Sequence, residues 1–479
     1  MIDTIKIQKN SDVPIYLQIA EEFRRQIEIG KLTPGSKMPS RRTLTKILSI
    51  SANTVNSAYN TLLQEGLILT YPKSGYIVAS SKRNNVADWS SYIKRAKHKP
   101  GNNEMKFWAD AGGLSDFGLS SDFDIHPYIV EAMKNAVARS YELDCKSDYS
   151  IFGYIPLRQS IVKHVEKLGI KANINNILIC PGGVQILHPL YESLMTSGSN
   201  FLHEQSNIIS AISDIHSIGM NMIPISIDEH GLSAMELEKA IMKHKHPILH
   251  VDLTDQAPTG TVMSKQRKKT IMQIIDKYHL PVIELEHLRD VWHTSPFPPP
   301  LKSMDKNGNV IYFGMFVRSC PFDLQTSWIV ADEFIINHLG NVFIQDGVKA
   351  NYFIQIVVDE MFRSGMYEIM MKAVRRFIGN RRALALEMCN KYLSKYGKWV
   401  EKNCNFHFWL DFPGINTRVA FKNKYFKHFH PGYFFNKTDT THILICPSSI
   451  REEELEKSIM DIASLVEEYM NPRAGTENC

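Results

Sequence analysis

Short apolar runs alternate with helical stretches along residues 106–345, and this alternation constrains the fold more than any other feature. The apolar runs read "NILIC", "NFLHE", "HPILHVDL", "LPVIELE", "NVIYFG" and "SWIVAD". Helical stretches such as "GGVQILHPLYESLM" and "SKQRKKTIMQIIDKYH" separate them. The pattern predicts a large α/β domain with a mainly parallel sheet and helices on both faces. Residues 346–479 are predicted to form a connecting helix and a small C-terminal α+β subdomain.

Residues 1–80 show a different order of elements. Apolar spacing predicts helices within residues 14–30, 41–50 and 52–66, followed by a hairpin within residues 67–80. Ser40 and Ser51 are placed to cap the second and third helices. We expect Leu44 and Ile47 of the second helix to face inward, and likewise Val55, Ala58 and Leu62 of the third. Together these elements predict a winged helix-turn-helix domain.

The outer face of the third helix carries short polar side chains that can contact bases and phosphates in a DNA groove. Arg41 and Arg42 begin the preceding helix, where a phosphate backbone would pass. The candidate DNA contacts are Arg41, Arg42, Ser51, Asn53, Thr54, Asn56, Lys73, Ser74 and Gly75, the last three at the tip of the hairpin. The alternative is a three-helix core without a role in DNA binding.

Charge is distributed unevenly along the chain. Residues 1–100 contain 16 Lys and Arg against 7 Asp and Glu, whereas the remainder contains 39 against 43. A basic end on a mildly acidic body indicates an anionic partner, although a solvated charged surface would give the same balance. Residues 81–105 are also basic and end in Pro-Gly-Asn-Asn, which predicts a linker.

Several classes of protein are excluded by composition. The seven cysteines form no C-x-x-C pair and follow no signal peptide, so we expect a reduced, cytoplasmic protein without a metal site. No apolar run approaches the ~20 residues that span a bilayer, so no membrane partner is expected. With 479 residues, the chain is too long for a single ordinary core.

The N-terminal motifs "PIYLQI…GKLTPGSKMPSRRTLTK…SISANTVNSAYNTLLQEGLI" resemble the GntR family of bacterial transcriptional regulators. The resemblance implies a double-stranded DNA operator as partner. It places Arg42, Ser51, Asn53, Thr54, Asn56 and Gly75 where the family contacts DNA. Ala52 stands where many family members have an arginine, so the recognition helix itself is uncharged.

Five later motifs resemble landmarks of fold type I aminotransferases, in the same order and at similar spacing. They are "GYIPLRQSI", "CPGGVQIL", "DQAPTG", "VIELEH" and "YFGMFVRSCPFDLQTSW". A GntR domain fused to such a domain resembles the MocR subfamily. That resemblance implies a homodimer, head-to-tail, in which each DNA-binding domain lies on the large domain of its partner.

The cofactor positions implied by this resemblance carry the wrong residue types. Arg318 stands at the lysine that would bind pyridoxal phosphate (PLP), and its guanidinium cannot form a Schiff base. Leu285 replaces the acid that pairs with the cofactor ring, and Leu444 replaces the arginine that grips a substrate carboxylate. The remaining changed positions are His287, Asp255, Val317 and Gln325. We therefore expect no covalently bound PLP, no cofactor and no enzymatic activity.

Two roles stay open for the altered cleft. Arg318 and His287 are candidate contacts to an anionic small-molecule effector. Alternatively, Arg318 pairs with Asp255 or Asp323 and fills the vacated space. We predict a sequence-specific transcriptional regulator whose aminotransferase-like domain dimerises and is available to sense a ligand. The alternative is a PLP-responsive MocR regulator or an aminotransferase-type enzyme.

Overall fold

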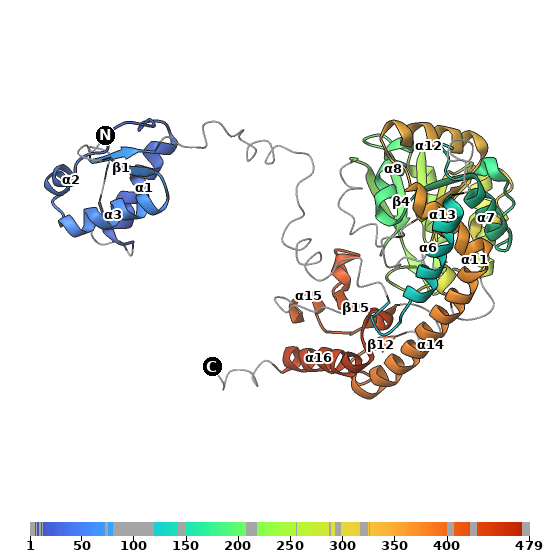
Figure 1. Ribbon diagram of the computed structural model, residues 1–479. Helices are drawn as coiled ribbons and strands as arrows, with labels where there is room; N and C mark the ends of the chain where they lie inside the picture. The colour runs from blue at the N-terminus through green and yellow to red at the C-terminus, as the bar shows by residue number, and fades with distance from the viewer. Residues whose placement is uncertain are drawn as a thin grey trace. The chain divides into compact units, whose positions relative to one another are not determined.

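The computed structural model separates the chain into two compact units, Met1–Lys99 and Pro100–Cys479 (Figure 1). The residues that it describes are 5, 7–8, 11, 13–71, 75–79, 119–141, 150–206, 218–254, 256–286, 289–292, 298–316, 324, 326–399, 407–421 and 429–471. The predicted linker, residues 81–105, lies outside them. The predicted domain boundaries at 80, 105 and 345 therefore stay predictions.

The N-terminal unit consists of three helices and a hairpin. Its elements are α1 (Ile15–Glu28), α2 (Arg41–Leu48), α3 (Ala52–Gln64), β1 (Ile68–Tyr71) and β2 (Gly75–Val78). The two strands are antiparallel, with Ile68 opposite Val78. This order confirms the predicted winged helix-turn-helix.

Both predicted helix caps are present in this unit. The hydroxyl of Ser40 accepts a hydrogen bond from the Thr43 amide at 3.0 Å, and that of Ser51 accepts one from the Thr54 amide at 3.1 Å. The predicted inner stripe of α3 and Leu44 of α2 are fully buried. Ile47, predicted to face inward, is instead 52% exposed. Leu48 packs on the core in its place, because it lies one turn after Leu44 on the same side of α2.

The second unit is organised around a seven-stranded sheet in the order β3-β11-β10-β9-β8-β4-β5. Its strands are β3 (Ile177–Pro181), β4 (Asn200–Glu204), β5 (Asn221–Ile225), β8 (Pro247–Val251), β9 (Val282–Glu286), β10 (Val310–Met315) and β11 (Thr326–Val330). Only β11 runs antiparallel to its neighbours, so the predicted mainly parallel sheet is confirmed. The sequence interpretation missed β5, an edge strand whose Pro224 disfavours a strand in the interior of a sheet.

Helices cover both faces of this sheet, as the alternation predicts. One face packs on α6 (His126–Ser140), α7 (Ile155–Glu166), α8 (Leu187–Leu194), α12 (Glu333–Gln345) and α13 (Tyr352–Arg363). The other face packs on α10 (Ala234–Lys243) and α11 (Lys265–Tyr278). Two separate hydrophobic clusters result, so each strand between them has two buried faces.

The C-terminal subdomain follows the long helix α14 (Met366–Tyr392). A four-stranded antiparallel sheet, in the order β12-β13-β15-β14, packs with α14 and α16 (Glu452–Met470). Its strands are β12 (Lys398–Trp399), β13 (Phe408–Asp411), β14 (Phe429–Pro431) and β15 (His442–Ile445). The sequence predicts one long helical region before this sheet. The structure instead has two helices, α13 and α14, which are separated at Gly365, where a φ of +76° favours glycine.

Residues 119–122 are hydrogen-bonded to this C-terminal subdomain. The Ser120 amide donates to the Ser448 carbonyl at 2.7 Å. Arg381, 3% exposed on α14, donates to Asp122 at 2.9 Å and to the Ile450 carbonyl at 2.6 Å. Asp122 also accepts the amide of Glu452 at the start of α16, at 2.7 Å. We call this group the Arg381 clasp, because it joins the first described segment of the second unit to its last helix.

Candidate functional site

The helix-turn-helix exposes most of the side chains predicted to contact DNA. Arg41, Arg42, Ser51 and Asn53 are exposed, while Thr54 and Asn56 are half-buried. Ser51 serves mainly as the cap of α3, since its hydroxyl also lies 2.8 Å from that of Thr54. The exposed face of α3 is thus polar and uncharged above a buried apolar stripe, which suits insertion into a major groove.

Arg41 is tied to α3 by a contact that spans 15 residues of sequence. Its Nη1 donates to the side-chain oxygen of Asn56 at 2.8 Å, and its guanidinium carbon lies 5.6 Å from the ring centre of Tyr76. The predicted contacts Arg41 and Asn56 are therefore brought together. Of the predicted hairpin tip, Lys73 and Ser74 lie outside the described residues. Gly75 begins β2 with a φ of +87°, a conformation that favours glycine.

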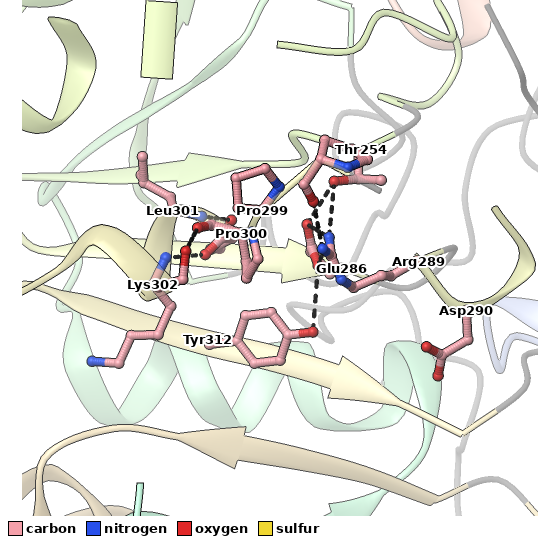
Figure 2. Close-up of polar contacts among 12 residues, drawn as sticks. Thr254, Glu286, Arg289, Asp290, Pro299, Pro300, Leu301, Lys302 and Tyr312 are labelled. Carbon is pink, nitrogen blue, oxygen red and sulfur yellow. Dashed lines mark hydrogen bonds and ion pairs between the residues drawn. The ribbon is translucent and has the colours of Figure 1, made fainter. Parts of the chain in front are cut away.

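A second group of polar side chains lies where β8 and β9 end (Figure 2). Glu286, at the end of β9, accepts hydrogen bonds from Arg289 at 2.9 Å and from the Thr254 hydroxyl at 2.6 Å. The Tyr312 hydroxyl lies 3.4 Å from the same carboxylate, and Arg289 also donates to the Pro298 carbonyl. Glu286 and Arg289 are almost fully buried, so this ion pair is part of the protein interior.

Glu284 lies two residues earlier on the same face of β9. Its two carboxylate oxygens accept the amides of Leu301 and Lys302 at 2.6 and 2.8 Å. Burial, together with the nearby charge of Glu286, raises the pKa of Glu284 from 4.5 to about 7. The buried amine of Lys268 donates to the Pro299 carbonyl at 2.7 Å, and burial lowers its pKa. These contacts fix the turn after Pro298 against the sheet.

Leu285 faces the opposite side of β9. It is 5% exposed and belongs to the same hydrophobic cluster as Ile283 and Phe313. Leu444 is fully buried in β15. The other positions named from the sequence, Arg318, His287, Asp255, Val317, Gln325 and Asp323, lie outside the described residues.

Two buried polar contacts near these strand ends were not predicted. His250 is a fully buried residue of β8, inside the run "HPILHVDL" that the sequence predicts to be a strand. Its Nδ1 lies 2.6 Å from the hydroxyl of Tyr191, and burial together with His203 lowers the pKa of His250 to about 3. The amide of Asp252 donates to Glu204 at 3.1 Å. The alternation of "PILHV" could have indicated that His250 faces inward.

No group of three or more His, Cys, Asp or Glu side chains in the described part of the chain could hold a metal ion. No described helix is both long and apolar enough to cross a bilayer.

Comparison with known proteins supports the division into two units. Residues 15–78 match the family "Bacterial regulatory proteins, gntR family". The chain is similar to two Bacillus subtilis (strain 168) proteins described as uncharacterized HTH-type transcriptional regulators. It is 27% identical to YdfD and 25% identical to YisV, in each case over 96% of this chain and 98% of the relative. It is also 25% identical to the HTH-type transcriptional regulator NorG of Staphylococcus aureus (strain bovine RF122 / ET3-1), over 84% and 93%.

Solved structures match the fold of the larger unit. Kynurenine aminotransferase of Pyrococcus horikoshii aligns with a TM-score of 0.69 at 19% identity, over 81% of this chain and 98% of the enzyme. A multiple substrate aminotransferase of Thermococcus profundus aligns with a TM-score of 0.71 at 19% identity, over 81% and 100%. The chain therefore joins a GntR helix-turn-helix domain to a domain with the fold type I aminotransferase fold, which is the MocR-type architecture.

Proposed function

We propose that this DNA-binding transcriptional regulator of the GntR/MocR type recognises a double-stranded operator as a cytoplasmic homodimer and has no aminotransferase activity. One observation carries the proposal. The helix-turn-helix holds an exposed polar face of α3 next to Arg41 and Arg42, above a core that is fully buried. Short polar side chains contact base edges, and cationic side chains contact both phosphates and the acceptor edge of guanine.

The side chains on the two faces of β9 support the proposed absence of aminotransferase activity. PLP, when bound in this fold, supplies an electron sink that needs a carboxylate beside the ring nitrogen. Leu285 is packed in the core at that position, and the neighbouring Glu286 is bonded to Arg289 and Thr254 on the other face. The described residues therefore do not fit the cofactor. Arg318 at the lysine position supports the same conclusion, because an arginine cannot form the covalent link.

Dimerisation is proposed from the aminotransferase-like fold. A twofold dimer would present two helix-turn-helix domains to a repeated operator. We propose a head-to-tail arrangement, as in the MocR resemblance. The aminotransferase-like domain would then serve as the dimerisation module and as the sensor of a small molecule bound without covalent chemistry. Arg318 and His287 are the proposed contacts to an anionic effector.

DNA binding is tested with the full-length protein and the DNA upstream of its own gene, at physiological salt. We expect a sequence-specific gel shift that Arg42→Ala and Asn53→Ala both weaken. Arg25→Ala is the matched control, because Arg25 is an exposed cation of α1 that pairs with Glu22 within the same helix. Absence of any sequence-specific complex would contradict the proposed function.

Cofactor and effector binding are tested separately. After addition of PLP and borohydride, we expect no trapped adduct and no absorption band of a lysine-bound cofactor. A trapped adduct would favour the alternative of a PLP-responsive regulator or enzyme. Calorimetry with phosphorylated and carboxylated metabolites, with Arg318→Ala as control, tests the effector. No heat change with any candidate would count against a ligand.

A further inference from the structure

The recognition helix α3 lacks the side chain that most often identifies guanine. Its sequence, ANTVNSAYNTLLQ, contains no charged residue. Arginine makes the commonest specific contact in the major groove, because its planar fork matches the N7 and O6 acceptors of guanine. If α3 enters the groove, as the proposed function requires, any guanidinium that reads a guanine there comes from another element.

Arg41 supplies a guanidinium at this place from the start of α2. Its Nη1 donates to the Oδ1 atom of Asn56, which lies in the second turn of α3. On another side, the group lies over the ring of Tyr76 in β2. Arg41 is therefore held between the recognition helix and the hairpin. The guanidinium of the neighbouring Arg42 makes no hydrogen bond or ion pair with the described residues.

The backbone beneath Arg41 is also fixed. Ser40, directly before it, caps α2 through the Thr43 amide. The buried Tyr59 of α3 donates its hydroxyl proton to the Pro39 carbonyl at 2.6 Å. The residues before and after the cap, Pro39 and Arg41, are thus both bonded to α3. An arginine that is held in place in this way loses less rotamer entropy when it binds DNA.

The hydrogen bond to Asn56 uses one of the five guanidinium N–H groups. Enough donors remain for a bidentate contact with an acceptor pair. The same bond occupies an oxygen of Asn56, so that this side chain presents mainly its NH2 donors to DNA. Asn56 is then suited to orienting Arg41, in addition to making a contact of its own.

We propose that Arg41 reads a guanine edge in the operator and takes the place of the arginine absent from α3, with Asn56 and Tyr76 as its positioning residues. The inference rests on the proposed function and deepens it, because it names the base class and the residue that recognises it.

The test begins with selection of preferred sequences from a random DNA pool by the full-length wild-type protein. Affinities for the selected site and for unrelated DNA are then measured over a range of salt concentrations. A bidentate guanine contact predicts that Arg41→Ala weakens binding to the selected site by roughly 5- to 150-fold. Binding to unrelated DNA should change much less, and the preference for one G·C pair should disappear.

Two further variants separate base reading from charge. Asn56→Ala should weaken specific binding less than Arg41→Ala, and the double variant should be no worse than Arg41→Ala alone, because both act through one guanidinium. Arg25→Ala, which removes the same charge from α1, should leave the base preference unchanged. The variants change surface side chains, and their helical circular dichroism should match that of the wild type.

A phosphate contact would give a different result. In that case Arg41→Ala would weaken selected and unrelated DNA equally and lower the salt slope by about 1, with every base preference kept. That outcome overturns the assignment of Arg41 while leaving the proposed function intact. A wild-type protein that selects no sequence would contradict both.

Discussion

In the N-terminal unit, the polar side chains of α3 are exposed above an apolar stripe. In the second unit, the polar side chains where β8 and β9 end are buried and bonded to one another. Both units keep the fold of a functional domain. The exposed polar side chains of the N-terminal unit remain available to a partner, whereas the buried polar side chains at the ends of β8 and β9 stabilise the fold of the second unit. Substitutions should therefore affect recognition in the first unit and stability in the second.

The largest expected effect is that of Arg289→Met, which leaves the buried Glu286 without its cation. Removal of one partner of a buried ion pair lowers the free energy of unfolding by about 3–5 kcal/mol. Denaturant unfolding of the second unit, followed by tryptophan fluorescence, measures this loss. The double variant Glu286→Gln, Arg289→Met should lose less than the single one. Equal losses would mean that Glu286 and Arg289 are not coupled.

A smaller loss is expected from Gly314→Ala in β10. The indole of Trp328 lies where a Cβ atom at position 314 would be, so that the added methyl must displace it. Overpacking of this kind costs about 1–3 kcal/mol of unfolding free energy. Gly198→Ala is a partial control. No atom lies within 4 Å of a Cβ atom at position 198, but the φ of +85° there is strained for alanine. A Gly314→Ala protein of unchanged stability would contradict the packing of Trp328.

Glu284 makes stability depend on pH. Its raised pKa means that folding takes up a proton between pH 4.5 and about 7, so wild-type stability should fall as pH rises through this window. Glu284→Gln should flatten this part of the profile while losing about 1–3 kcal/mol at low pH, since an amide has only one oxygen for two backbone donors. Parallel profiles for the two proteins would show that Glu284 is not the responsible group.

The smallest effect should come from the N-terminal unit. Ser51→Ala removes the cap of α3 and should lower the stability of this unit by about 1 kcal/mol. The exposed Ser57→Ala serves as its control, with a change within about 0.5 kcal/mol. Thermal unfolding followed by circular dichroism compares the two. If Ser57→Ala is as destabilising as Ser51→Ala, the cap does not stabilise α3.

Local features were predictable from the sequence. Ser40 and Ser51 precede periodic apolar residues, so the caps and the stripe of Val55, Ala58 and Leu62 follow from neighbouring positions. The apolar strands of the central sheet were found in the same way. That Leu285 and Glu286 point to opposite faces of β9 followed from strand alternation.

Contacts between distant segments were not predictable. The bond from Arg41 to Asn56 depends on the angle between two helices, which periodicity does not give. The strand that contains His250 was predicted, but the contact of this histidine with Tyr191, 59 residues earlier, was not, because it depends on how α8 packs on the sheet. Ile47 was misplaced because a helix of eight residues has room for only a narrow apolar stripe.

The Arg381 clasp has a consequence for the synthesis of the chain. All members of the N-terminal core lie between Ile5 and Val78, so that this unit can fold soon after it leaves the ribosome. Asp122, in contrast, needs the amide of Glu452, which is made 330 residues later. At the usual rate of about 5–20 residues per second, that interval lasts roughly 15–70 seconds. The DNA-binding unit is therefore complete well before the unit that we propose pairs two copies of it.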